Sequence, residues 1–123
     1  MEVPGQPAAP TPADAWSFFL EGINSLMRQW SALRMAIENN WGGGDSQAKA
    51  SLMTQQLIPL FQGKSPPQLE DVEDFLVDSM EDYFSTLIED DSTSEVAQIL
   101  LQMYHECGKL DFSTVQRVTG AEK

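Results

Sequence analysis

The stretch that decides the fold covers residues 69–95 and reads LEDVEDFLVDSMEDYFSTLIEDDSTSE. It contains eleven carboxylates and no lysine or arginine, and no lysine or arginine occurs anywhere between Lys64 and Lys109. A helix normally mixes acids with bases, because like charges four residues apart repel and opposite charges attract by a few tenths of a kcal/mol. This stretch lacks that compensation, so we expect its positive counterpart to come from outside the chain.

At about 100° per residue, the stretch divides into an apolar face and an acidic face. The apolar face contains Leu69, Val72, Leu76, Met80, Tyr83, Phe84 and Leu87. The acidic face contains Glu70, Asp71, Asp74, Asp78, Glu81, Asp82 and Glu89, with Glu73 and Asp90 off the face and Phe75 at its edge. Two interpretations fit this pattern: the solvated face of an amphipathic helix, and a docking surface for a strongly basic partner.

Length and charge limit the possible functions. The chain has 123 residues, a net charge of −12 and a sequence pI near 4.1, which suits one domain with a modest core. A polyanion would repel nucleic acid and anionic membranes, and seven scattered cations supply no basic patch. The charge favours a basic protein as the partner.

Cysteine content and hydropathy indicate the compartment. The single cysteine, Cys107, excludes an internal disulfide and a cysteine-cluster zinc site, which fits a reducing environment. No apolar run reaches the length of a membrane span, and the N-terminus lacks the pattern of a signal peptide. We therefore expect a soluble, intracellular protein.

Periodicity predicts a first helix over residues 13–39, after a disordered proline-rich tail at residues 1–12. Its apolar residues alternate three and four apart: Trp16, Phe19, Ile23, Leu26, Trp30, Leu33 and Ile37. This heptad seam is compatible with a coiled-coil homodimer, and so with a structural or dimeric helical adaptor. Phe18, Met27 and Met35 widen the stripe, which favours a core-facing helix within one bundle and a monomeric protein.

The first helix should end at the segment NNWGGG, residues 39–44, because Asn and Gly tolerate left-handed backbone geometry. Trp41 in this turn is either a plug over the end of the bundle or an exposed anchor for a partner. The plug is the favoured interpretation for a large apolar side chain.

A second helix is predicted over residues 46–62, with a kink or early end near Leu57 because Pro59 removes a backbone donor. Asp45 or Ser46 should cap it, and its inward residues should be Leu52, Met53, Leu57, Leu60 and Phe61. The breaker-rich segment GKSPPQ, residues 63–68, should link it to the acidic helix.

Ser92 and Glu95 have the spacing of a capping box for a fourth helix over residues 93–106, with Gly108 after its end. A short last helix should carry Val115 and Val118, followed by a tail at residues 119–123. No run alternates at period two. The fold class is therefore all-α, a small helical domain at residues 13–118 with four main helices plus a short C-terminal helix.

The sequence gives little support for catalysis. His105 and Cys107 are two residues apart and so face different sides of a helix. The run EDDSTSE, residues 89–95, lacks the glycine and the register of an EF-hand loop, and no Glu-x-x-His pair suggests a di-iron site. The three glycines at 42–44 lack the lysine of a phosphate-binding loop. We expect a protein that is not an enzyme and holds no metal or cofactor.

Two blocks resemble a known family: WSALRMAIENNWGGGDSQAK, residues 30–49, and LEDVEDFLVDSMEDYFSTLIEDDSTSEVAQIL, residues 69–100. Both are similar to the eukaryotic pre-ribosomal-RNA-processing (twenty-S rRNA accumulation) family. The first block matches at Trp30, Ala32, Leu33, Ala36, Ile37, Glu38, Asn39, Trp41, Gly42 and Gly43. The second matches at Asp71, Val72, Glu73, Asp74, Phe75, Leu76, Phe84, Glu89, Asp90 and Ser92. Two departures are Ser31, where many members have proline, and the extended acidic C-terminal tail of longer members, whereas this sequence stops at Lys123.

The resemblance implies an escort chaperone that is found in the nucleus and nucleolus, with part of the protein also in the cytoplasm. Members of the family take a basic small-subunit ribosomal protein, number twenty-six, from its import receptor and deliver it to pre-ribosomes. The expected client-binding residues are Glu70, Asp71, Glu73, Asp74, Phe75, Asp78, Glu81, Asp82, Glu89, Asp90 and Asp91, with Glu38 and Trp41 at a second edge. This agrees with the charge argument, because a cationic client needs an anionic surface.

Overall fold

The structure is a computed structural model that describes residues 12–88 and 91–122. These residues form six α-helices and two short 3₁₀ segments, and no strand occurs among them. The α-helices are α1 (Pro12–Gln29), α2 (Ser31–Glu38), α3 (Ser46–Leu57), α4 (Leu69–Phe84), α5 (Ser92–Cys107) and α6 (Ser113–Glu122), and the 3₁₀ segments are η1 (Gly43–Asp45) and η2 (Ile58–Phe61). The all-α class is confirmed, but six helices replace the expected four plus one.

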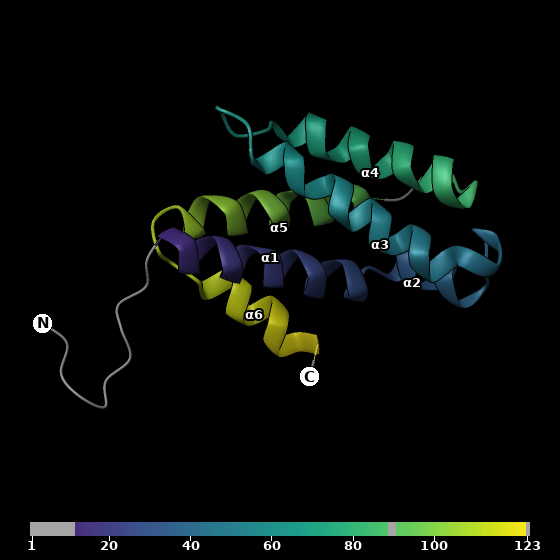
Figure 1. Cartoon of the computed structure of the whole chain (residues 1–123), viewed down its shortest axis with the longest axis horizontal. Coiled ribbons are helices and arrows are strands. Elements are labelled where there is room, and N and C mark those ends of the chain that lie inside the picture. Colours follow the sequence, from purple (N-terminus) through teal and green to yellow (C-terminus); the bar gives the residue numbers. More distant parts are fainter. Residues whose placement is uncertain (1–11, 89–90, 123) are drawn as a thin grey trace, which may run out of the picture.

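The helices form a bundle in which α4 is an outer element (Figure 1). Helix α1 packs against α5 and α6, and α3 connects this layer to α4 by packing against α2 and α4. Helix α4 also packs against α5, the helix that follows it in the chain. One side of α4 therefore faces the bundle and the other faces solvent.

The heptad seam of the first helices lies inside the monomer. Phe19, Ile23, Leu26, Trp30 and Leu33 are buried, and Trp16 and Ile37 are half-buried against the same core. A coiled-coil homodimer would need these side chains at its surface. The structure therefore removes the basis for a dimeric adaptor built on this seam.

The predicted single helix over residues 13–39 is wrong, because the helix breaks at Trp30. Trp30 has extended geometry (φ −65°, ψ 115°), with its N–H donating to Leu26 O at 3.0 Å and its C=O accepting from Arg34 N at 2.9 Å. Its buried indole Nε1 donates to Ser92 Oγ at 3.0 Å. This bond joins residues 62 apart in sequence, so periodicity within the helix contains no signal for the break.

The acidic helix is shorter than the 100° pattern suggests. Helix α4 ends at Phe84, and Ser85 has left-handed geometry at φ 50°, with its N–H donating to Glu81 O at 2.9 Å. Leu87, which we place on the apolar face, is 64% exposed because it lies beyond the helix. Glu89 and Asp90 lie outside the described residues.

Other helix ends also differ from expectation. Asp91 is the N-cap of α5 and Ser92 is its first residue, so the predicted Ser92–Glu95 capping box is wrong. At the other end of α5, the left-handed residue is Leu110 (φ 59°), not Gly108. On α3, Asp45 is the N-cap without a side-chain bond, and the early end at Leu57 before Pro59 is confirmed.

Leu52 is exposed rather than inward. The buried side of α3 is defined by Ser46, Ala50, Met53, Thr54 and Leu57. Leu52 precedes Met53 by one residue, so it points about 100° away from that side.

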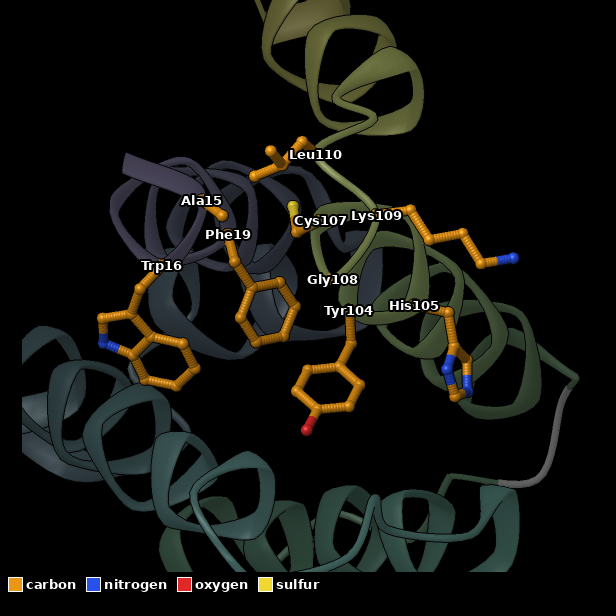
Figure 2. A pocket seen from close by; sticks show the side chains of 9 residues that line it. All are labelled: Ala15, Trp16, Phe19, Tyr104, His105, Cys107, Gly108, Lys109 and Leu110. Atoms are coloured by element: carbon orange, nitrogen blue, oxygen red, sulfur yellow. The ribbon is translucent and has the colours of Figure 1, made fainter. Parts of the chain in front are cut away.

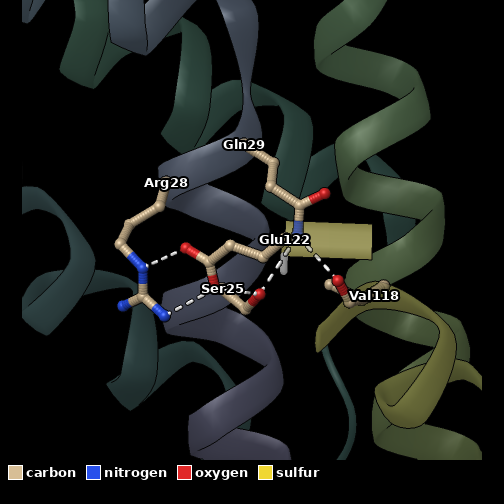
Figure 3. A network of polar contacts seen from close by, with 5 residues as sticks. All are labelled: Ser25, Arg28, Gln29, Val118 and Glu122. Carbon is tan, nitrogen blue, oxygen red and sulfur yellow. Dashed lines mark hydrogen bonds and ion pairs between the residues drawn. The ribbon is translucent and has the colours of Figure 1, made fainter. Parts of the chain in front are cut away.

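Helix α6 extends through Glu122, where we predicted a tail from residue 119. A polar network holds its end against α1 (Figure 3): Glu122 accepts from Ser25 Oγ at 2.7 Å and from the Arg28 guanidinium at 2.9 Å. The side chain of Gln29 adds a bond from Nε2 to Val118 O at 2.7 Å. The hydrogen bonds from Arg28 and Ser25 lower the pKa of Glu122 to about 2, which keeps the carboxylate charged.

None of the described helices combines the length and apolar character that a membrane span needs.

The break at Trp30 gives a testable role to residue 31. Ser31 is the first residue of α2, where proline is favoured because its missing N–H has no intrahelical partner. Trp30 already has the extended geometry that a residue before proline adopts. We expect Ser31→Pro to leave stability unchanged or raise it by about 0.4–1 kcal/mol in urea unfolding.

The matched control is Arg34→Pro, which removes the Arg34 N–H···O=C Trp30 bond and should cost about 3 kcal/mol. A loss of stability in Ser31→Pro as large as that of the control would show that α1 and α2 form one continuous helix.

Candidate protein-binding surface

Helix α4 is oriented by burial of one side. Val72, Leu76, Met80 and Phe84 are buried, and Ser79 lies among them. At the N-terminus, Gln68 N donates to Asp71 Oδ2 at 3.0 Å, and Asp71 N donates to the backbone O of Gln68 at 3.0 Å. This cap places Glu70 and Asp71 at the positive end of the helix dipole.

The carboxylates opposite the buried side are exposed. They are Glu70, Asp71, Asp74, Asp78, Glu81 and Asp82, and we call them the acidic face of α4. The two ion pairs found among the described residues are Arg28–Glu122 and Arg34–Glu38, so neither involves this face. Within the described chain, the acidic face therefore has no cation at ion-pairing distance.

The remaining predicted residues of α4 lie at the edge of this face. Glu73 is half-buried and its Oε1 accepts from Ser94 Oγ at 3.5 Å, which agrees with its predicted position off the face. Phe75 is half-buried against the core, so part of its ring is accessible beside the acids. Asp91 is exposed and precedes α5.

The second predicted edge, Glu38 and Trp41, lies at the α2–α3 connection. Glu38 is exposed and lies 3.9 Å from Arg34, one helical turn earlier. Trp41 is 44% exposed, so it is not a fully covered plug over the end of the bundle. It lines a depression of about 420 Å³ together with Phe84, the last residue of α4, and with Ser85 and Thr86, which follow it. The structure thus brings Trp41, but not Glu38, to a shared depression with α4.

The Trp-Gly-Gly turn is built tightly against α4. Asn40 (φ 54°) and Gly43 (φ 82°) have left-handed geometry, as their residue types predict. A Cβ on Gly42 would lie 3.0 Å from Cδ1 of the buried Phe84 ring, so a larger residue there would force the ring or the turn to shift. From the sequence, Gly42 is expected only to help end the preceding helix. The residues around it give no sign of its contact with Phe84, which is 42 residues away.

A second hollow, of about 550 Å³, lies between the start of α1 and the end of α5 (Figure 2). It contains aromatic side chains and both residues considered for nucleophilic chemistry. Figure 2 shows Cys107 directed toward α1 and His105 directed away from it. Burial raises the pKa of the Cys107 thiol to about 11, so a thiolate is not available at neutral pH. The hollow therefore supplies no activated nucleophile.

The described residues contain no cluster of three or more His, Cys, Asp or Glu side chains arranged to hold a metal ion. The acids of α4 lie along one helix face instead of converging on a point, which is the geometry of an extended charged surface.

Comparison with known proteins identifies relatives of this chain. Residues 19–98 match the family model described as Pre-rRNA-processing protein TSR2. The Saccharomyces cerevisiae protein of that name is 32% identical over 97 residues, which cover 79% of this chain and 47% of the yeast protein. The Mus musculus homolog is 34% identical over 106 residues, covering 86% of this chain and 56% of the mouse protein.

A solved structure also matches, described as the NMR solution structure of yeast TSR2(1-152). Its TM-score is 0.76 at 31% identity, with 85% of this chain and 67% of that chain covered. The chain spans about half the length of the curated relatives it matches.

Contact between Gly42 and Phe84 leads to a prediction about the turn. Gly42→Ala should cost about 1–3 kcal/mol of unfolding free energy, because the added methyl overpacks against a ring that is buried and cannot move aside. Gly44→Ala is the control: a Cβ there meets nothing within 4 Å, so stability should change by less than about 0.5 kcal/mol. Equal effects of the two substitutions in thermal or urea unfolding would contradict the packing of the turn against α4.

Proposed function

The chain belongs to the family of the Pre-rRNA-processing protein TSR2, and on that premise we propose that it acts in ribosome biogenesis as a non-enzymatic escort chaperone. It binds a basic small-subunit ribosomal protein, number twenty-six, through the acidic face of α4. It releases this client from its import receptor and delivers it to pre-ribosomes in the nucleus and nucleolus, where small-subunit rRNA matures. The observation that carries the proposal is an exposed row of carboxylates with no cation at ion-pairing distance in the described chain.

The distribution of charge supports binding over simple solubility. Exposed acids that serve only solubility are normally interspersed with lysine or arginine, because the mixture removes repulsion along the helix. In α4 the acids at positions 70, 74, 78 and 82 follow one another at four-residue spacing. A cationic client removes this repulsion when it binds, so the helix gains most from a partner that is strongly basic.

The bundle also supports a single protein acting as the binding unit. The apolar side chains of the α1–α2 seam are packed in the core of this chain. The acidic face can therefore form without a second copy of the protein. Anchored by α3 and α5, α4 presents its acids from a helix, which holds them in a fixed row.

A charge-reversed variant tests the proposal. Glu70, Asp74, Asp78 and Glu81 are replaced together by Lys, and binding to the purified ribosomal protein is measured by titration calorimetry at about 0.1 M salt. Four exposed attractions become repulsions, so affinity should fall by roughly 100-fold or more. Helical circular dichroism should not change, because all four side chains are exposed.

Two single variants separate position from net charge. Asp78→Lys and Glu21→Lys change the charge equally, but Glu21 is exposed on α1, which packs mainly against α5 and α6. Only Asp78→Lys should weaken binding, and the affinity of the native chain should fall steeply with added salt. Binding that survives the quadruple reversal, or that is weakened equally by Glu21→Lys, would refute the proposed surface.

A further inference from the structure

Trp41 is a large aromatic side chain that the fold leaves 44% exposed. The largest apolar side chains are the ones whose burial stabilises a fold most, and a tryptophan contributes more apolar area than any other residue. Its depression, shared with Phe84, Ser85 and Thr86, is open to solvent at the end of α4. Apolar surface of the indole therefore remains accessible to a ligand at the end of α4.

The backbone around Trp41 is held rigidly. Trp41 N donates to Ala36 O at 2.9 Å, and Gly42 N donates to Ser46 Oγ at 3.1 Å. Lys49 Nζ donates to Gly42 O at 2.7 Å, which closes the turn from the other side. These bonds order the backbone that carries the indole before any ligand arrives, which lowers the entropy that binding must remove.

The charge around the depression indicates a cation as the occupant. It lies at the C-terminus of α4, the negative end of the helix dipole, and the last turn contains Glu81 and Asp82 with no basic residue. Lys49 of α3 also lies beside the turn, and its ammonium is held by a hydrogen bond from Nζ to Gly42 O at 2.7 Å. An aromatic face within a negative field is the environment that a cation–π contact requires.

We propose that the depression at Trp41 is an arginine-binding subsite, in which a guanidinium of the basic client stacks on the indole while its charge is balanced by the end of α4. This inference rests on the proposed function, since it names the side chain that the client supplies. Arginine fits better than lysine, because the planar guanidinium stacks on an aromatic face and is more weakly hydrated than an ammonium. The acidic face thus supplies charge attraction, and Trp41 supplies a preference for one kind of cation.

Two peptide probes of equal charge test the subsite: hepta-arginine and hepta-lysine, titrated into the purified chain at low salt. The native chain should bind hepta-arginine roughly five-fold more tightly than hepta-lysine, which is the scale of an exposed cation–π contact. Trp41→Leu should remove this preference and leave the affinity for hepta-lysine unchanged. Leu110→Ala is the control, because Leu110 is also exposed but lies at the α5–α6 connection, at the other end of the bundle (Figure 1).

The indole N–H resonance of Trp41 gives an independent readout. It should shift with hepta-arginine and much less with hepta-lysine. An arginine preference that persists in Trp41→Leu, or equal binding of both peptides by the native chain, would overturn the subsite while leaving the acidic face intact. If neither peptide binds, or if binding survives reversal of the four α4 carboxylates, the proposed function itself fails.

Discussion

The structure depends on the burial of one side of α4. Val72, Leu76, Met80 and Phe84 are each buried, and burying a side chain of this kind contributes about 1.5–3 kcal/mol. Repulsion among acids four residues apart opposes this stabilisation, and it costs roughly 0.2–0.5 kcal/mol for each neighbouring pair. Packing is the larger effect by several-fold, so the bundle can keep a helix whose outer face has no compensating cations. The same burial fixes the direction in which that face points.

Much of the fold follows from local pattern, and the errors occur where tertiary contacts decide. Periodicity finds the apolar stripes of α1, α3, α4 and α5, and Pro59 correctly shortens α3. The break at Trp30 depends on an indole bond to Ser92, 62 residues away, which no window of sequence contains. The bonds from Ser25 and Arg28 likewise hold Glu122 at the end of α6, so the helix continues where composition alone suggests a tail.

The candidate site divides in the same way. The acidic face was predictable because amphipathic spacing assigns each position on a helix to the core or to solvent, and the structure exposes Asp74 and Asp78 as that spacing requires. The exposure of Trp41 could not be predicted in this way, because a large apolar residue in a turn is more often buried. The turn that carries it lies against α4, where Gly42 is next to the buried Phe84 ring. That contact joins a turn residue to a residue of α4 and has no local signature.

Binding of a basic client to the outward side of α4 is the step on which the proposed function depends. Its most direct test is to titrate the purified ribosomal protein into the isotope-labelled chain and to map the backbone amide shifts by NMR. We expect the largest shifts on α4 from Glu70 to Asp82 and on the turn at Trp41, with little change along α6. Shifts concentrated on α1 and α6, with α4 unaffected, would contradict it.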